Sequence, residues 1–163
     1  MVVPEEVVLL LTGVPATGKS TFGKYLCQEA GFAHYDLECY PDGWAHVEPR
    51  PFWQQRDLPG FMAQVTSLDA RIALDWGFPP ACRPMVDHLR ALGATLVWFD
   101  GDRRRARELY VERGKYDVGL FDGQVARIDA AGLPHSLACP VITTLGATGV
   151  PADPRDIAEA VFT

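Results

Sequence analysis

The sequence predicts a three-layer α/β fold, in which helices cover both faces of a parallel β-sheet. Short apolar runs alternate along the chain with amphipathic segments of helical length, as in strands joined by crossover helices. The first apolar run leads directly into a glycine-rich turn and then a helix-forming segment, which is the strand, loop, helix order of such folds. At 163 residues, the chain is expected to form a single domain over residues 1–163.

The composition excludes several classes of protein. Hydrophobic residues make up 48% of the chain and charged residues 22%, which is typical of a globular domain rather than of a disordered chain. A net charge of -6 argues against a general nucleic-acid surface, which requires a basic patch. No apolar run approaches the roughly 18 residues of a membrane span, and the acidic start lacks the basic residues of a secretion signal. We therefore expect a cytoplasmic protein that is not bound to a membrane.

The cysteines and histidines do not predict a metal site. They are scattered along the chain, at Cys27, Cys39, Cys82, Cys139, His34, His46, His88 and His135. No C-x-x-C pair or other ligand spacing is present among them. Reduced thiols of a cytosolic chain are the favoured interpretation.

Hydrophobic patterning and turn residues predict the elements of the first half. In order, they are a strand at 7–11, a helix near 19–30, a short strand near 32–36, a helix at about 60–68 and a strand at 71–75. Gly31 is expected to end the first helix, because glycine readily adopts the left-handed conformation that follows a helix. The stretch 40–60, rich in Pro, Gly and Trp, is expected to be irregular and to hold no core element. It is either a substrate-binding insertion or a surface connection, and we favour the insertion, within a substrate-side segment of about 36–68.

The second half continues the alternation. We expect a helix that has Pro84 in its first turn and ends before Gly93. The remaining elements are a strand at 95–99, a charged helix at 102–113, a mobile loop at 114–120, a helix at 122–131, a strand at 140–145 and a helix at 153–161. Asp153 and Pro154 are expected to open the last helix as its N-cap and first residue.

The turn after the first strand has the spacing G-x-x-x-x-G-K-S, which is the P-loop pattern. Glycines let the backbone turn its N–H groups inward around a phosphate chain, and the dipole of the following helix adds positive potential. Lys19 is expected to reach the β- and γ-phosphates and Ser20 to ligate Mg²⁺, with Thr21 just behind it. The predicted nucleotide-binding residues are Gly13, Val14, Pro15, Ala16, Thr17, Gly18, Lys19, Ser20, Thr21 and, further along the chain, Arg113. An ordinary glycine-rich turn is the alternative.

Three acidic residues lie at the ends of predicted strands. Asp75 closes the strand at 71–75, and an acid at the carboxyl end of a central strand faces the phosphates, where it holds Mg²⁺ through water. Asp36 and Glu38 lie on one side of the second strand if that strand continues to residue 38. One of them, Asp36 by preference, is expected to accept the proton of an acceptor hydroxyl, which makes both candidates for substrate contact. The alternatives are a surface acid for Asp75 and loop caps for the other two.

Arginines are concentrated in the predicted helix at 102–113. Helical spacing pairs Arg104 or Arg105 with Glu108, so part of this group is expected to be a solvated face. Arg113 differs because it lies where the helix gives way to a glycine-containing loop, from which a guanidinium can swing over the β- and γ-phosphates. Whether the arginines at 103–107 or Arg127 also reach the phosphates stays open.

The stretch 40–60 contains three large aromatic residues, Trp44, Phe52 and Trp53. They could shape an acceptor pocket, since the stretch is the predicted substrate-binding insertion. Large aromatic side chains usually fill cores, however, and that interpretation is at least as well supported.

Taken together, these motifs resemble those of small P-loop kinases of the shikimate, gluconate and adenylate kinase group. GVPATGKST resembles the glycine loop of the group, and DWGFPP (75–80) resembles the D-G-F-P-R turn of adenylate kinases, with Trp76 inserted and Pro80 in place of the arginine. WFDGDRRRARELYVERGKYD followed by GQVARID is similar to the lid region of gluconate kinases, and Arg113 matches the lid arginine. The resemblance covers nearly the whole chain, and its first motif is the most specific part.

The resemblance implies a P-loop NTPase fold with a five-stranded parallel sheet of order 2-3-1-4-5 and a short lid at about 113–124. It implies ATP and Mg²⁺ as cofactors and a small-molecule acceptor, with residues 145–152 beside the adenine ring. Two departures concern the acceptor: the acidic pair is D-x-E rather than D-x-D, and the shikimate-binding arginine and glycine cluster has no sure counterpart. Neither the acceptor nor the oligomeric state is therefore predicted.

The leading hypothesis is transfer of a phosphoryl group from ATP, with Mg²⁺, onto a hydroxyl of a small molecule, with Lys19, Asp36 and Arg113 as catalytic residues. A nucleotide-binding module or degenerate ATPase without kinase activity is the alternative. A kinase acting on polynucleotide ends is disfavoured by the acidic net charge. A regulatory GTPase would need an N-K-x-D motif to read guanine, and the chain contains no asparagine.

Overall fold

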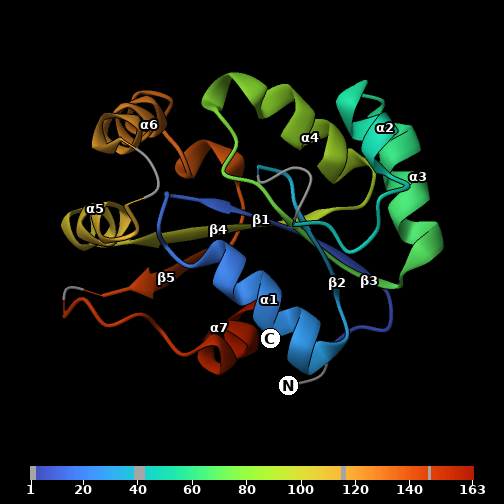
Figure 1. The fold of residues 1–163 in the computed structure, drawn as a ribbon, viewed down its shortest axis with the longest axis horizontal. Coiled ribbons are helices and arrows are strands. Elements are labelled where there is room, and N and C mark those ends of the chain that lie inside the picture. The colour runs from blue at the N-terminus through green and yellow to red at the C-terminus, as the bar shows by residue number, and fades with distance from the viewer. Residues whose placement is uncertain (1–2, 39–42, 115–116, 147) are drawn as a thin grey trace.

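The computed structural model describes residues 3–38, 43–114, 117–146 and 148–163, which form one five-stranded sheet with helices around it (Figure 1). The strands are β1 (Val7–Gly13), β2 (Ala33–Asp36), β3 (Arg71–Asp75), β4 (Thr95–Gly101) and β5 (Val141–Leu145). The helices are α1 (Lys19–Ala30), α2 (Arg50–Gln54), α3 (Leu58–Leu68), α4 (Arg83–Ala91), α5 (Arg103–Glu112), α6 (Val118–Ala130) and α7 (Pro154–Phe162). Every predicted strand is present within about two residues of its expected bounds.

The strand order is β2-β3-β1-β4-β5, and every neighbouring pair is parallel. This confirms the predicted α/β fold and its order 2-3-1-4-5. In the central strand β1, Leu11 is in register with Asp75 of β3, and Gly13 with Phe99 of β4. Asp36, at the end of β2, is in register with the same Asp75. The carboxyl ends of β1, β2 and β3 therefore meet at one edge of the sheet.

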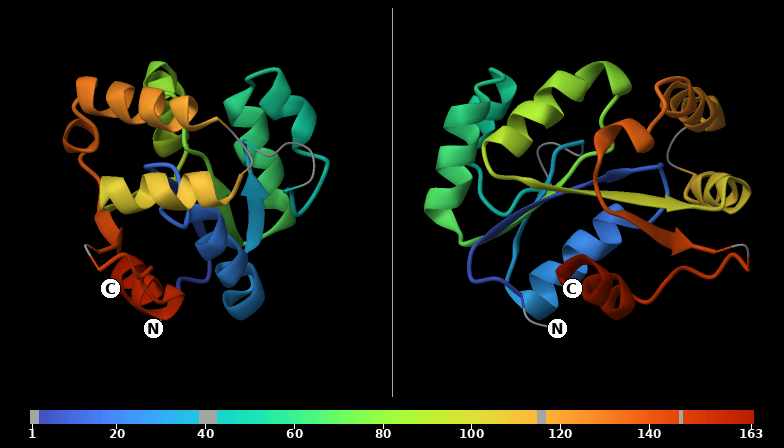
Figure 2. Two further views of the ribbon diagram at one scale, coloured as in Figure 1. Left: turned by 60° about the vertical axis from the view of Figure 1, so that its left-hand side comes forward. Right: turned by 180° about the vertical axis from the view of Figure 1, so that it is seen from behind.

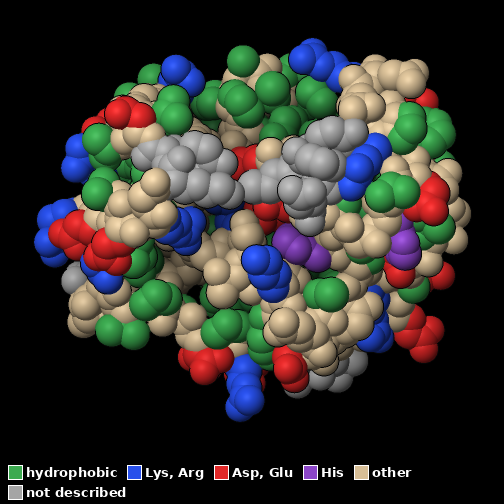
Figure 3. Space-filling model, in the orientation of Figure 1, with side chains coloured by type: hydrophobic (Ala, Val, Ile, Leu, Met, Phe, Trp, Pro, Cys, Tyr) green, Lys and Arg blue, Asp and Glu red, His purple; other side chains and the backbone are tan. Residues whose placement is uncertain are grey.

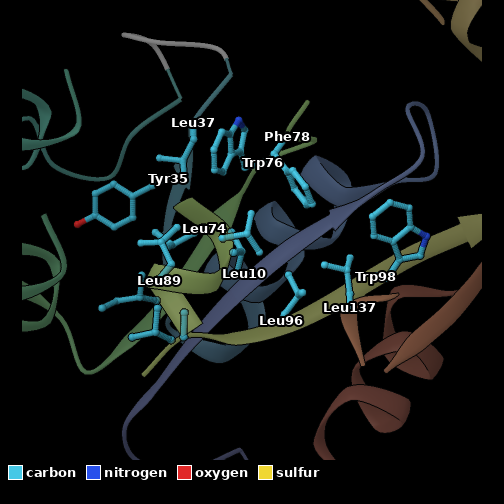
Figure 4. Close-up of a cluster of buried hydrophobic side chains, with 14 of the residues drawn as sticks. Leu10, Tyr35, Leu37, Leu74, Trp76, Phe78, Leu89, Leu96, Trp98 and Leu137 are labelled. Carbon is cyan, nitrogen blue, oxygen red and sulfur yellow. The ribbon is translucent and has the colours of Figure 1, made fainter. Parts of the chain in front are cut away.

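Successive side chains of β1 divide between two hydrophobic clusters, one on each face of the sheet. Leu9 and Leu11 pack in a cluster with Phe22 of α1 and Ile157 of α7. Leu10 belongs to the larger cluster, to which α3, α4, α5 and α6 contribute and part of which Figure 4 shows. Figure 2 shows α1 and α7 together on one side of the sheet. The period of two along the strand thus produces the three layers.

Two helix ends confirm the signals predicted from local sequence. Gly31 follows α1 in the left-handed conformation, with a φ of 67°, and its N–H donates to the Leu26 carbonyl oxygen. The Asp153 carboxylate accepts a hydrogen bond from the Arg155 N–H at 2.8 Å, and Pro154 is the first residue of α7. Local sequence therefore sets where these helices end and begin.

Two stretches predicted to be irregular contain helix. The expectation that 40–60 holds no core element is wrong, because α2 and the start of α3 lie in it. Asp57 caps α3 by accepting a hydrogen bond from the Gly60 N–H, so the helix begins at Leu58 rather than at 60. Likewise, α6 begins inside the predicted loop at 114–120, because Asp117 caps it by accepting from the Gly119 N–H. In both cases the missed signal is an aspartate in the N-cap position.

Some predictions concern residues outside the described part of the chain. These are Cys39, the 39–42 portion of the substrate-side segment, residues 115–116 of the predicted loop and lid, and residue 147 of the stretch expected beside adenine. The single domain over 1–163, the lid at about 113–124 and the cytoplasmic location stay predictions. Within the described residues, no helix combines the length and the hydrophobicity needed to cross a bilayer.

Candidate active site

The loop between β1 and α1 is shaped by close packing against β4 and by a left-handed turn. A Cβ atom on Gly13 would collide with the Phe99 carbonyl oxygen, so only glycine fits where β1 ends. Gly18, which precedes α1, has a φ of 91°, a conformation that favours glycine. Among the described residues, no protein acceptor takes a hydrogen bond from the backbone N–H groups of residues 16–21. The loop therefore offers a row of backbone donors at the amino end of a helix.

Lys19 is the first residue of α1 and is buried, with only 8% of its surface exposed. Its Nζ atom donates a hydrogen bond to the Val14 carbonyl oxygen at 2.9 Å. Burial lowers the pKa of Lys19, the carboxylates of Asp75 and Glu38 raise it, and Arg113 lowers it again. The ammonium group therefore lies within electrostatic range of both carboxylates and of the guanidinium.

The loop opens into a cleft of about 500 Å³. Figure 3 shows this face of the molecule, with acidic side chains in a hollow and Lys, Arg and His side chains around it. Three predicted residues do not line the cleft: Gly13 packs against β4, Val14 is in the core, and the Thr17 hydroxyl donates to the Val14 carbonyl oxygen at 2.7 Å. The predicted residues that do line it are Pro15, Ala16, Gly18, Lys19, Ser20, Thr21, Asp36, Glu38, Asp75 and Arg113.

Asp75 ends β3 at the floor of the cleft and is only 3% exposed. Its Oδ2 atom is buried without a hydrogen-bond partner, and the His34 Nε2 atom, 3.7 Å away, is also without one. Gly23 of α1 leaves space for this imidazole, since a Cβ atom there would collide with the ring. A buried, unpartnered carboxylate oxygen in the same cleft as Ser20 is the kind of ligand, direct or through water, that Mg²⁺ uses. The residues present therefore fit this metal.

Asp36 and Glu38 line the cleft from the end of β2, although the strand stops at residue 36. The Asp36 Oδ1 atom accepts a hydrogen bond from the Glu38 N–H at 3.0 Å, and its backbone oxygen accepts one from the Trp44 indole at 2.8 Å. Glu38 is exposed to the cleft, yet protein atoms crowd its carboxyl group, and this partial burial raises its pKa. Lys19 lowers that pKa, Asp75 and Asp36 raise it, and a hydrogen bond from the Gly77 N–H lowers it.

Arg113 follows α5 and borders two spaces at once. It lines the cleft and also a second pocket of about 190 Å³ on the other side of the loop. Phe22, Leu109, Leu145 and Pro151 give this second pocket a largely apolar lining. Its walls include part of the stretch 145–152 that is predicted to lie beside adenine.

The other arginines of the charged helix pair with acids of the protein. Within the described residues, none of the arginines at 103–107 lines the cleft, and Arg127 opens into an adjoining hollow of about 270 Å³. The charged helix therefore gives the cleft no arginine besides Arg113, which follows it. The ion pairs of the others are Arg103–Asp100, Arg103–Asp129, Arg104–Glu108, Arg105–Glu108, Arg105–Glu112 and Arg107–Asp122.

The cleft contains further residues that the sequence did not indicate. Gln124 of α6 donates a hydrogen bond from Nε2 to the Gly77 carbonyl oxygen at 3.0 Å, which links α6 to the turn after β3. Lys24 lies one helical turn after Ser20, a spacing that could have predicted its place. No local signal marks the others, because distant segments bring them in. The set is Lys24, His34, Gly43, Gly77, Tyr110 and Gln124.

The three aromatic residues of the stretch 40–60 pack against the core. Trp44 meets the Tyr35 ring edge-on, with centroids 5.5 Å apart, and Trp53 packs on Phe61 with centroids 5.3 Å apart. Phe52 also packs against the large hydrophobic cluster. In the described structure none of the three lines the cleft, so the core interpretation holds.

Solved structures of kinases share the fold of this chain. A gluconokinase from Sinorhizobium meliloti 1021 gives a TM-score of 0.62 at 14% identity, over 98% of this chain and 91% of that one. A sugar kinase from Janibacter sp. HTCC2649 gives 0.63 at 16% identity, over 96% and 92% of the two chains. A shikimate kinase from Acinetobacter baumannii, solved in complex with shikimate, gives 0.58 at 18% identity, over 96% and 90%. The chain has the P-loop kinase fold.

The similarity is one of structure rather than of sequence. No family model matches the chain, and no curated protein matches it. Identities of 14% to 18% establish the fold and not the reaction, because one fold hosts many functions. The resemblance noted from the motifs is thereby confirmed at the level of the fold, and the reaction has to be argued from the cleft.

Proposed function

We propose that the chain is a kinase that transfers the γ-phosphoryl group of ATP, with Mg²⁺, to a hydroxyl group of a small molecule. The observation that carries the proposal is the cleft, in which Lys19, three carboxylates and Arg113 converge on one space next to the P-loop. The fold shared with solved kinases supports it.

The donor side is assigned to the loop and the apolar pocket. The unpaired N–H groups of residues 16–21 and the amino end of α1 suit the β- and γ-phosphates, with Lys19 as their point charge. Adenine suits the second pocket, beside Leu145 and Pro151. Arg113 borders both spaces, so one guanidinium can contact the phosphate chain between them and stabilise the charge that develops in transfer.

Ser20 and Asp75 are the residues assigned to Mg²⁺, the first through its hydroxyl and the second through its unpartnered Oδ2 or an intervening water. When bound, the ion supplies neutralisation of the phosphate charge. The His34 Nε2 atom lies 3.7 Å from the Asp75 Oδ2 atom.

Glu38, in preference to Asp36, is assigned the role of proton acceptor. Asp36 uses Oδ1 to hold the Glu38 N–H and so shapes the loop, whereas the raised pKa of Glu38 suits a group that takes up a proton. In the step, the acceptor oxygen bonds to the γ-phosphorus as the bond from that phosphorus to the β–γ bridging oxygen breaks. ADP leaves, and the hydroxyl proton passes to Glu38.

The test is ATP consumption measured against a panel of hydroxylated metabolites, with Lys19→Ala as the control. We expect turnover that depends on one acceptor class and that falls to background in the Lys19 variant. Turnover that survives Lys19→Ala would reject the assigned site. Nucleotide binding without turnover of any acceptor would favour the alternative, a binding module or degenerate ATPase.

A further inference from the structure

Positive and negative side chains line the cleft from different elements of the fold. The cations come from the P-loop, the first turns of α1 and the end of α5, as Lys19, Lys24 and Arg113. All of these lie on the side assigned to the phosphates of ATP. The carboxylates of Asp36 and Glu38 come from the opposite wall, at the end of β2.

Apart from Asp75 and His34, which also line the cleft, the wall around these two carboxylates consists of polar, uncharged groups in the described residues. Gly43 and Gly77 present backbone to the cleft, and Tyr110 and Gln124 contribute a phenol and an amide. Both glycines lie close to the two acids: a Cβ atom on Gly43 would lie 2.6 Å from the Asp36 Cβ, and one on Gly77 would lie 2.5 Å from Glu38 Oε1 and would displace the end of that side chain. The acceptor therefore meets carboxylates, an amide, a phenol and main chain.

Negative charge is already crowded at this end of the cleft. Glu38 has a raised pKa, chiefly because of burial; Lys19 lowers this pKa, whereas the neighbouring Asp75 and Asp36 raise it. An acceptor with a carboxylate or phosphate placed here would add a further negative charge to the same space. Hydroxyl groups donate hydrogen bonds to carboxylates, and an amino group would also neutralise one of them.

We propose that the acceptor is a small polyhydroxylated molecule without an anionic group, either uncharged or carrying an amino group. The inference rests on the proposed function and specifies its substrate class. Gluconate and shikimate, which the names of two structural neighbours contain, are carboxylates, so this chain would differ from those neighbours in the charge it accepts.

Arg127 could allow the opposite preference, for an acceptor that carries a carboxylate. Arg127 opens into the adjoining hollow, which shares Gly77, Tyr110 and Gln124 with the wall of the cleft. A carboxylated acceptor long enough to extend past Gln124 would meet this guanidinium instead of the acidic wall. A variant at Arg127 therefore separates the two arrangements.

The experiment compares acceptors that differ only in charge on the same carbon skeleton. Three carbon skeletons are used: open-chain six-carbon polyols, open-chain five-carbon polyols and cyclohexane polyols. Each skeleton is tested in an uncharged form, a form with an amino group and a form with a carboxylate. We measure kcat/KM for ATP consumption and, separately, ATP binding by calorimetry. In any series that is turned over, the uncharged or amino form should exceed the carboxylate form by more than about tenfold, which one misplaced charge is sufficient to cause.

A second arm uses Glu38→Gln, with Glu29→Gln on the exposed far end of α1 as the matched control. Because Glu38 is also the assigned proton acceptor, its substitution should slow the reaction with every acceptor. This common loss cancels when kcat/KM for the amino form is divided by kcat/KM for the uncharged form. That ratio should fall in Glu38→Gln and stay constant in Glu29→Gln.

Three outcomes contradict the inference or its basis. A preference for carboxylate forms that disappears in Arg127→Ala overturns the inference and leaves the kinase assignment standing. ATP binding with no turnover in any series also counts against it. Failure to bind ATP at all contradicts the proposed function itself.

Discussion

Lys19 and Glu38 carry opposite charges, and the cleft shifts both toward their neutral forms. Burial lowers the pKa of the lysine and raises the pKa of the glutamate. Such perturbed pairs mark sites where protons or charge are transferred, because ordinary surface groups keep their ordinary values. The glutamate is then a better proton acceptor near neutral pH than an exposed carboxylate, whose conjugate acid is stronger.

This pair predicts a bell-shaped pH dependence. Because its pKa is raised, Glu38 stays protonated to higher pH, so kcat/KM should rise as pH increases past a midpoint above that of an ordinary glutamate. Because the pKa of Lys19 is lowered, the rate should fall again at a lower pH than an ordinary lysine would cause. Profiles of the wild type and Glu38→Gln check this: the variant should lose the acid limb and keep the alkaline one. An acid limb that is unchanged in Glu38→Gln would mean that another group accepts the proton.

Gly13 and Gly18 of the P-loop both have a positive φ, but a side chain would also collide with the protein only at Gly13. In Gly13→Ala the new Cβ collides with backbone of β4 and the φ of 131° is unfavourable as well, so the free energy of unfolding should fall by about 3 kcal/mol. In Gly18→Ala nothing lies within 4 Å of the new Cβ, and only the left-handed φ is unfavourable, at about 1–2 kcal/mol. Urea denaturation of both variants measures the difference. If both variants lost the same free energy of unfolding, the backbone around residue 13 would be able to move aside for the new Cβ atom at no cost.

At the scale of elements, Arg113 directly after α5 lines the cleft, whereas the arginines within α5 form ion pairs. Arg107 binds Asp122 of α6 through two contacts, at 2.8 and 3.0 Å, so the two helices are tied together on their exposed side. Exposed pairs of this kind contribute little to stability. Their effect is to hold Arg107 away from the cleft, while Arg113, beyond the end of the helix, borders it.

The effect on kcat of substituting an arginine should therefore depend on where that arginine lies. Arg113→Ala is expected to lower kcat by about a hundredfold to a thousandfold, because a guanidinium near the developing charge is lost. Arg104→Ala, on the exposed face of the same helix, should leave kcat within about twofold, since its pair with Glu108 is a surface contact. Steady-state rates at saturating ATP check both. Equal effects at the two positions would remove Arg113 from the catalytic assignment.

The sequence predicted these elements where the signal was local. The glycine that follows α1, the aspartate that precedes α7 and the proline that begins α7 each set a helix end through residues next to that end. The beginnings of α3 and α6 were misplaced, although Asp57 and Asp117 act by the same mechanism. Tryptophan, proline and glycine near Asp57, and glycines near Asp117, gave a stronger loop signal than a single capping residue gave for a helix.

At the scale of the whole molecule, strand order places the site. Strands β2 and β3 lie on one side of β1 and β4 on the other, so the P-loop after β1 meets the acids that end β2 and β3. Ligands of open α/β sheets bind at this carboxyl edge. The P-loop motif and the acids were predictable because each directly follows a strand.

The remaining wall of the cleft was not predictable, for a physical reason. Tyr110 comes from α5 and Gln124 from α6, two helices that are far from the P-loop in sequence and border the cleft in the folded structure. His34 lies on β2, an edge strand, with its side chain in the cleft. Nothing in the sequence distinguishes it from a buried histidine whose hydrogen bonds are made within the core. Their places depend on tertiary packing, which local patterns do not encode.

The central claim is that the loop from Gly13 to Ser20 binds a triphosphate, and calorimetric titration with ATP and with adenosine tests it most directly. Both ligands offer the same base and ribose, so the difference in affinity reports the phosphates alone. We predict that the wild type binds ATP more than about tenfold tighter than adenosine, and that Lys19→Ala loses most of this difference. Equal affinities for the two ligands, or an unchanged ATP affinity in Lys19→Ala, would contradict the account.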